Sequence, residues 1–198
     1  KPKGVMIEHG NIMYSISARN DLYRGPQVFI LLSSVSLDSS VAGIFETLTN
    51  GGRLILNPTV DAKNLDKIAK IILDQRVTRV IAVPSFYKVL LQKLGGQPNN
   101  LRRVTVAGEE CPKQLVDEHL NNPNLADCVL YNEYGPTECT IWATYVKYAK
   151  NESFKATIGR PISDTRIYIL NEAQQLQPKG VIGEIFIGGP GVAKGYLN

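Results

Sequence analysis

The segment at residues 132–138 carries the densest set of side chains that could do chemistry. It reads Asn-Glu-Tyr-Gly-Pro-Thr-Glu and follows a short apolar run that is typical of a buried strand. An aromatic ring can stack on a purine, a hydroxyl can donate to a phosphate, and a carboxylate can hold Mg²⁺ beside that phosphate. The same residues suit a loop in which Gly135-Pro136 turns the chain and Thr137 caps a helix. Residue types alone leave both interpretations open.

Asp38 is a second carboxylate of interest, because it directly precedes a segment with helical character. A side chain in that position commonly acts as the N-cap of the helix, a role worth about 1 kcal/mol. From the sequence alone, the N-cap is the interpretation that we favour for Asp38.

The elements that must position these residues follow from the alternation of short β-branched runs with helix-length segments. Strands are predicted at 28–32, 53–56, 79–83, 104–107 and 128–131, and helices at 39–50, 61–75, 84–95 and from 112 onward. This order predicts an α/β fold, with a mostly parallel sheet flanked by helices as part of a larger lobe. Ligands of such sheets bind outside the carboxyl ends of the strands. We therefore expect the chemistry in residues 36–42, 83–87, 107–110 and 132–138.

The pattern changes after residue 149. Residues 166–170 and 184–187 alternate in polarity and are separated by turn residues, without a helical segment between them. We expect residues 1–149 to form an α/β substrate- and nucleotide-binding subdomain that is incomplete at its N-terminus. Residues 150–198 would then begin a small antiparallel β-subdomain that is truncated.

Composition narrows the class of protein. The 198 residues are 43% hydrophobic and 20% charged with a net charge of +4, and neither a basic block nor an apolar run of about 20 residues occurs. These features argue against nucleic acid and membranes as partners. Three cysteines without a CxxC pair, and an N-terminus without a signal peptide, favour a fragment of a cytoplasmic protein.

Four collinear segments resemble motifs of the adenylation domains of nonribosomal peptide synthetases, which belong to the acyl-adenylate-forming superfamily. Residues 132–138 resemble the NxYGPTE signature, and residues 1–5 resemble the end of the TSGTTGKPKG phosphate loop. Residues 37–40 stand where the family has FDxS, with Leu37 in place of the aromatic residue. Residues 183–197 resemble GELxIxGxGVARGYL, with Lys194 in place of the arginine.

The resemblance implies an enzyme, an ATP-dependent ligase. It would form an aminoacyl-adenylate and pyrophosphate from an amino acid and Mg-ATP, by positioning and electrostatic stabilisation of the in-line attack. The amino acid would then pass to the phosphopantetheine of a peptidyl carrier protein, one of several synthetase modules that act as partners. Because other motifs of the family lie outside residues 1–198, we expect these residues alone to be inactive.

The resemblance also assigns residues to the nucleotide. Tyr134 would stack on adenine, Asn132 would bond its amino edge, and Thr137 would touch the α-phosphate. Glu138 would hold Mg²⁺ and Lys3 would close the phosphate loop; Lys3, Thr137 and Glu138 are thus the implied catalytic residues. The implied nucleotide-binding residues are Gly108, Glu109, Asn132, Glu133, Tyr134, Gly135 and Thr137.

For the amino acid, the resemblance replaces the N-cap interpretation of Asp38 with an ion pair to the substrate α-ammonium. The implied lining of the side-chain pocket is Asp38, Ser39, Ala42, Ala82, Thr105, Ala107, Glu133, Ile141 and Trp142. Small residues leave room for a long side chain, an unpaired Glu133 would favour a cation, and Trp142 could stack on a guanidinium. This suggests a large polar or cationic substrate, arginine-like first and tyrosine-like second. The alternative is that Glu133 points to solvent and offers only its backbone to adenine.

Two other functions stay open. One is an acyl- or aryl-CoA ligase relative, which Asp38 and the segment at 132–138 argue against. The other is a non-catalytic fragment that binds a nucleotide or a protein partner.

Overall fold

The structure is a computed structural model of the chain, and it describes residues 4–56, 64–150 and 152–197. A seven-stranded sheet forms its centre, with the strand order β2-β1-β3-β4-β5-β6-β7. The first five strands of that order run parallel, and β6 and β7 run antiparallel to their neighbours. The strands of this sheet are β1 (Val28–Leu31), β2 (Arg53–Leu56), β3 (Arg79–Ala82), β4 (Arg103–Ala107), β5 (Val129–Tyr134), β6 (Thr144–Tyr148) and β7 (Arg160–Pro161).

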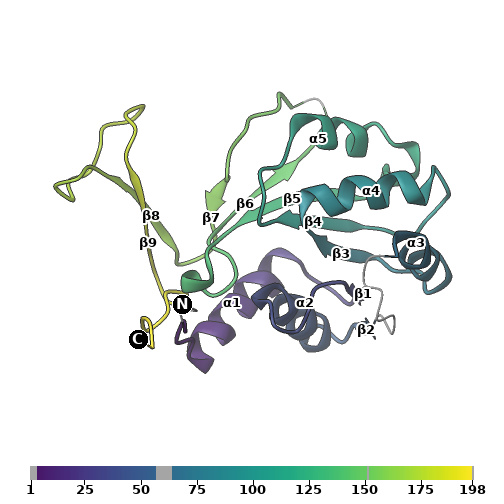
Figure 1. Ribbon diagram of the computed structural model, residues 1–198, viewed down its shortest axis with the longest axis horizontal. Coiled ribbons are helices and arrows are strands. Elements are labelled where there is room, and N and C mark those ends of the chain that lie inside the picture. The colour runs from purple at the N-terminus through teal and green to yellow at the C-terminus, as the bar shows by residue number, and fades with distance from the viewer. Residues whose placement is uncertain (1–3, 57–63, 151, 198) are drawn as a thin grey trace.

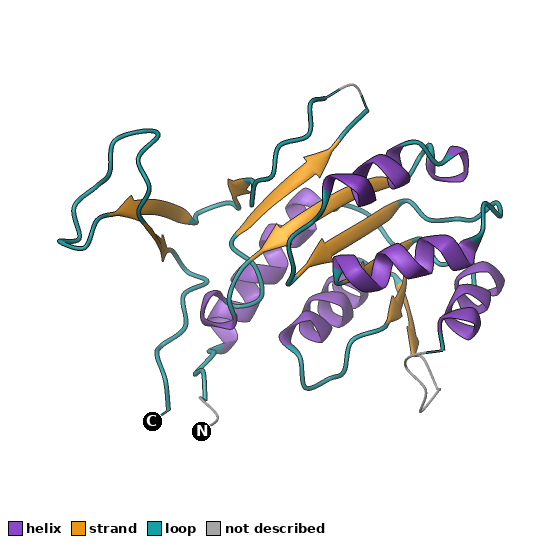
Figure 2. Cartoon of the chain, turned by 45° about the horizontal axis from the view of Figure 1, so that its top comes forward, coloured by secondary structure: helices purple, strands orange, loops and turns teal. Residues whose placement is uncertain are grey.

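Helices cover both faces of the sheet (Figures 1 and 2). The helices are α1 (His9–Leu22), α2 (Asp38–Thr49), α3 (Leu65–Asp74), α4 (Pro84–Leu94) and α5 (Lys113–Leu120). On one face, α3, α4 and α5 bury the main apolar core against β1, β3, β4 and β5. On the other face, α1 and α2 pack on smaller apolar clusters, which leaves room between them and the sheet for buried charged groups.

A second, two-stranded antiparallel sheet follows, formed by β8 (Arg166–Leu170) and β9 (Glu184–Gly188). It extends away from the main sheet (Figure 1), and the chain then returns to its start. There the backbone N–H of Leu197 donates to the carbonyl of Gly4 over 2.7 Å, so the two ends of the described chain lie side by side.

The predicted fold class is confirmed: a mostly parallel sheet flanked by helices precedes a small antiparallel β element. Helix α1 was not predicted, because its apolar residues do not gather on one face. The strands β6 and β7 were also missed. Since β7 pairs with β6 in the main sheet, that sheet extends to residue 161, and the division at residue 149 stays a prediction. No helix within the described ranges is long and apolar enough to cross a bilayer.

The N-cap interpretation of Asp38 is wrong. Asp38 is the first residue of α2, the N-cap is Leu37, and no side chain caps this helix end. The capping interpretation of Thr137 is also wrong, because Thr137 begins the 3₁₀ helix η2 (Thr137–Cys139) and Pro136 is its N-cap. Both side chains are therefore available for other contacts.

Candidate functional site

Two adjoining pockets open at the carboxyl ends of the parallel strands, where the fold class places ligands. The α2 pocket, of about 350 Å³, lies between the start of α2 and the ends of β3, β4 and β5. The β5 pocket, of about 620 Å³, lies on the other side of the end of β5. Both are lined by Ala107, Gly108, Glu133, Gly135 and Ile141, so a ligand in one pocket can touch a ligand in the other.

Most of the residues that the sequence analysis assigned to the amino acid line the α2 pocket. Its lining includes Asp38, Ser39, Ala42, Ala82, Ala107, Glu133 and Ile141. Thr105 and Trp142 do not line either pocket. Thr105 is fully buried in β4, and Trp142 packs in the apolar cluster beneath α1. The structure therefore does not bring these two residues to the predicted substrate pocket.

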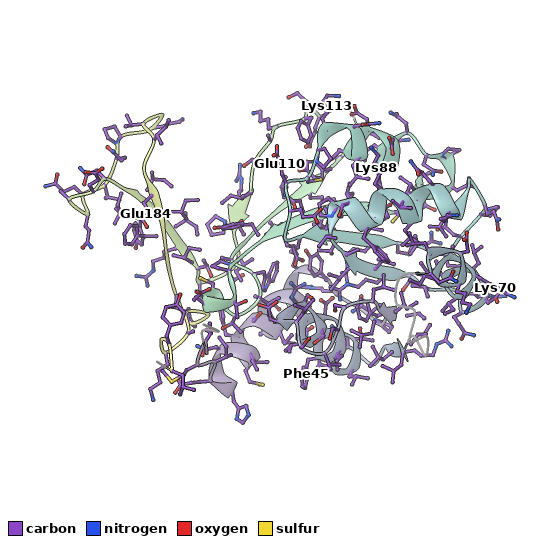
Figure 3. All side chains as sticks on the ribbon, viewed as in Figure 1. Phe45, Lys70, Lys88, Glu110, Lys113 and Glu184 are labelled. Carbon is purple, nitrogen blue, oxygen red and sulfur yellow. The ribbon has the colours of Figure 1, made fainter. Side chains whose placement is uncertain are left out.

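The residues that the sequence analysis assigned to the nucleotide, except Thr137, line the β5 pocket. Gly108, Glu109, Asn132, Glu133, Tyr134 and Gly135 line it. Glu110, labelled in Figure 3, lines the same pocket from the β4–α5 loop. Gly135 has no room for a side chain, since a Cβ there would lie 2.4 Å from the Cα of Trp142. Glycine therefore lets the backbone at residue 135 pack against Trp142, at a position that lines both pockets.

Thr137 lines neither pocket, but it forms a hydrogen bond with the first residue of α2. Its hydroxyl donates to Oδ2 of Asp38 over 2.8 Å. Asp38 is partly buried at the edge of the α2 pocket, and Thr137 is exposed. The predicted contact for a phosphate and the predicted contact for an amine are thus direct neighbours.

Glu133 is neither unpaired nor directed to solvent, so both sequence-based interpretations of its carboxylate are wrong. It is 4% exposed, and Nη1 of Arg19 donates to its Oε1 over 3.1 Å while Nη2 pairs with Oε2. The hydroxyl of Tyr23 donates to the same Oε1 over 2.7 Å. Burial raises the pKa of Tyr23 well above its usual value, and the Glu133 charge adds to this, so Tyr23 stays a neutral donor.

Arg19 is a residue of the site that the sequence analysis did not predict, as are Tyr23 and Tyr196. Arg19 is 1% exposed, lines the α2 pocket and lies with its guanidinium carbon 4.3 Å from the ring centroid of Trp142. The guanidinium of Arg19 therefore already contacts Glu133 and Trp142, the two residues that the sequence analysis assigned to a cationic substrate. The hypothesis of an arginine-like substrate stays a prediction, but it loses the unpaired carboxylate on which it rested.

The Arg19–Glu133 pair belongs to a buried ionic network under α1 and α2. Glu46, which is fully buried, lies 3.5 Å from Arg19 and 2.7 Å from Arg103, and also pairs with Arg79. Burial alone would raise the pKa of Glu46, yet these guanidinium groups hold it below its usual value. Glu46, Arg79 and Arg103 within otherwise apolar elements were the sequence signal for this network, but nothing in the sequence indicated how they pair or that Arg19 joins them.

Glu138 lies on η2, beside the last described residues of the chain. The hydroxyl of Tyr196 donates to its Oε1, and its carbonyl accepts from Ala193 N over 2.8 Å. Within the described ranges, His, Cys, Asp and Glu form no group of three that could hold a metal ion. Mg²⁺ bound to a nucleotide needs only one or two protein carboxylates, so Glu138 suits that ion. Lys3, the other predicted catalytic residue, lies outside the described residues.

Known proteins resemble this chain over its whole length. The sequence model of the family described as AMP-binding enzyme matches residues 1–197. All of the chain aligns with bacitracin synthase 3 of Bacillus licheniformis at 40% identity and with gramicidin S synthase 2 of Aneurinibacillus migulanus at 38%. The chain spans only 3% and 4% of these relatives.

Solved structures give the same result. The nonribosomal peptide synthetase FmoA3 matches all of the chain with a TM-score of 0.90 and 25% identity, over 22% of its own length. The Vibrio cholerae adenylation domain AlmE, solved with glycyl-adenosine-5'-phosphate, matches all of the chain with a TM-score of 0.86 and 27% identity, over 39% of its length.

Proposed function

Because this chain belongs to the AMP-binding enzyme family, we propose that it is the core of an adenylation domain that activates an amino acid for nonribosomal peptide synthesis. The reaction joins the amino-acid carboxylate to the α-phosphorus of ATP and releases pyrophosphate. The observation that carries this proposal is the hydrogen bond between Thr137 and Asp38. It brings a hydroxyl that can donate to a phosphate next to a carboxylate that can pair with an amine, beside the two pockets.

The α2 pocket suits the amino acid. Asp38 at its edge would pair with the α-ammonium, and the wall beyond is mostly apolar, with Ala42, Ala82 and Ile141 among its residues. The buried Arg19–Glu133 ion pair also lines the α2 pocket, and its two charges compensate each other. A substrate with an apolar stem fits this lining without leaving a buried charge unpaired.

The β5 pocket suits the adenosine part of ATP. Tyr134 offers a ring face for stacking, and Asn132, 7% exposed, offers an amide for the base edge. Gly108 stands in the left-handed region with φ +84°, which favours glycine and leaves the base edge of the pocket without a side chain. The hydroxyl of Thr137 would donate to the α-phosphate once it leaves Asp38.

Glu138 would hold Mg²⁺ through carboxylate oxygens. When bound, the ion supplies positive charge that neutralises the phosphate oxygens. The chain's own part is to orient this carboxylate, which Tyr196 does by donating to Oε1. The hydrogen bond to Glu138 raises the pKa of the exposed Tyr196 hydroxyl, so the hydroxyl remains a donor at neutral pH.

The relatives are named as peptide synthases, so the proposal extends to a partner carrier protein whose phosphopantetheine thiol receives the amino acid, and to further synthetase modules. The test is amino-acid-dependent exchange of pyrophosphate into ATP by the protein that carries this chain, assayed over the set of amino acids. Exchange with one or a few amino acids is expected. Exchange driven only by simple or aromatic acids without an amine would instead identify an acyl- or aryl-CoA ligase relative. Calorimetry with ATP on the folded chain that detects no heat would favour a fragment without nucleotide binding.

A further inference from the structure

A third pocket lies at the opposite end of the sheet, where β3, β4 and β5 begin. Its volume is about 290 Å³, and four arginines line it: Arg24, Arg79, Arg102 and Arg103. We call it the arginine pocket. No carboxylate is among the described residues that line it. It is separate from the α2 and β5 pockets, which open at the carboxyl ends of the same strands.

Arg79 is the deepest cation of the arginine pocket. It is fully buried; its Nη1 pairs with Oε1 of Glu46, while its Nε and Nη2 have no hydrogen-bond partner within the described ranges. Its charge is compensated by the Glu46 ion pair and by the faces of Tyr23 and Phe29, whose centroids lie 5.7 and 5.5 Å away. Burial lowers the pKa of Arg79 to about 10, against the opposing effect of the Glu46 charge.

Two buried carboxylates serve three guanidinium groups on this face of the sheet. Glu46 pairs with Arg79, Arg103 and Arg19, and Glu133 pairs with Arg19 alone. Arg103 donates from Nη2 to Oε1 of Gln27 and of Glu46, and it lies 4.0 Å over the ring of Tyr23. Its Nε has no hydrogen-bond partner among the described residues.

Two exposed arginines stand at the mouth of the pocket. Arg102, with a side chain 58% exposed, makes a loose 3.7 Å ion pair with Asp127. Arg24 donates from Nε to the carbonyl of Asp21 over 3.4 Å and is exposed to solvent. Both can reorient toward a ligand at little cost.

We propose that the arginine pocket binds a small polyvalent anion of the phosphate class, either free phosphate or a phosphate monoester. Planar guanidinium groups match phosphate oxygens with paired hydrogen bonds, and a dianion satisfies several of them at once. Such an anion also supplies acceptors for Nε and Nη2 of Arg79 and for Nε of Arg103, which have none among the described residues.

The test is calorimetric titration of the protein with inorganic phosphate, glycerol 3-phosphate and acetate at constant ionic strength. Saturable binding of a phosphate species at one site per chain is expected. Tighter binding of the ester than of inorganic phosphate would identify a phosphate monoester as the ligand, and the reverse would identify free phosphate. Binding of acetate as tight as either phosphate species, or no saturable binding, would overturn the proposal.

Variants locate the site. Because Arg24 and Arg102 are exposed, Arg24→Gln with Arg102→Gln leaves the fold intact and is expected to weaken phosphate binding by about tenfold or more. Arg166→Gln, an exposed arginine on β8, is the matched control and is expected to bind as the unchanged protein does. Thr137→Ala tests the nucleotide site in the same way. If Thr137→Ala abolishes the binding and the double variant does not, the phosphate sits beside Thr137 at the proposed nucleotide site and the proposal fails.

Discussion

The hydroxyl of Thr137 donates to Oδ2 of Asp38 over 2.8 Å, although the two residues are 99 positions apart in the chain. One residue begins the short helix after β5 and the other begins α2, so the contact ties together two loops at the carboxyl edge of the sheet. The carboxylate of Asp38 is also the group that we propose for the substrate amine. Substrate binding would therefore release the Thr137 hydroxyl toward the phosphate.

The substitution Asp38→Asn tests the charge at this position. The amide keeps an acceptor for Thr137 but removes the negative charge, so amino-acid-dependent pyrophosphate exchange should fall by about two orders of magnitude, mainly through a higher KM for the amino acid. Asp66→Asn is the control, because Asp66 is exposed and pairs with Lys93 on the surface. Unchanged exchange in the Asp38 variant would reject its role as the amine partner.

Tyr134→Ala tests the adenine contact. Loss of a stacking ring costs about 1–3 kcal/mol in nucleic-acid systems, so the Kd for ATP should rise about tenfold or more in a calorimetric titration. Tyr168→Ala on β8 is the matched change outside both pockets, and it should leave ATP affinity as it is. Equal affinity in both variants would remove Tyr134 from the nucleotide site.

Glu138→Gln tests the metal assignment. The change keeps the size of the side chain and an acceptor for Tyr196 but removes the charge that Mg²⁺ requires. The Mg²⁺ concentration for half-maximal exchange should rise about tenfold, and Glu184→Gln on β9, labelled in Figure 3, should not alter it. An unchanged Mg²⁺ dependence in Glu138→Gln would show that another group binds the ion.

The Arg19–Glu133 pair predicts a strong non-additivity in stability. Arg19→Met alone leaves a buried carboxylate with one neutral donor, which should lower the free energy of unfolding by about 3–5 kcal/mol in urea titrations. Arg19→Met with Glu133→Leu should cost less than the two single changes added together, because no charge is left unpaired. The exposed pair of Lys113 and Asp117 is the comparison, and Lys113→Met there should cost below about 1 kcal/mol. Additive costs at Arg19 and Glu133 would contradict the pairing.

His119 predicts a pH dependence of stability near neutrality. It is fully buried, with Nε2 donating to the Cys128 carbonyl over 2.9 Å and the Tyr87 hydroxyl 2.6 Å from Nδ1. Burial lowers the pKa of His119 in the folded protein, so the unfolded chain binds the proton more readily. The stabilisation is thus complete above the ordinary histidine pKa of 6.5 and is lost as the pH falls below it.

The measurement is the free energy of unfolding between about pH 8 and about pH 5. His119→Gln should flatten the slope of this free energy against pH. His9→Gln should leave the slope unchanged, because His9, the second histidine of the chain, is exposed. A slope that is the same in His119→Gln and in the unchanged protein would show that other groups set the pH dependence.

The sequence by itself determined the parallel sheet and the edge where the site lies. Short β-branched runs between helical segments are local signals, and the rule for ligands at the carboxyl ends of strands then places residues 36–42, 107–110 and 132–138 together. The structure brings Asp38, Ala107 and Tyr134 to that edge as expected. These residues were predictable because their positions follow from the order of the elements.

Only the tertiary structure decided how the buried charges pair. Arg19 lies 114 residues from Glu133, on a helix whose apolar residues do not mark one face, so neither the helix nor the pair was visible in the sequence. The packing of α1 over the sheet brings the guanidinium of Arg19 to the carboxylate of Glu133. A buried charge is stabilised by whichever opposite charge the packing brings within about 4 Å, and sequence distance carries no information about that contact.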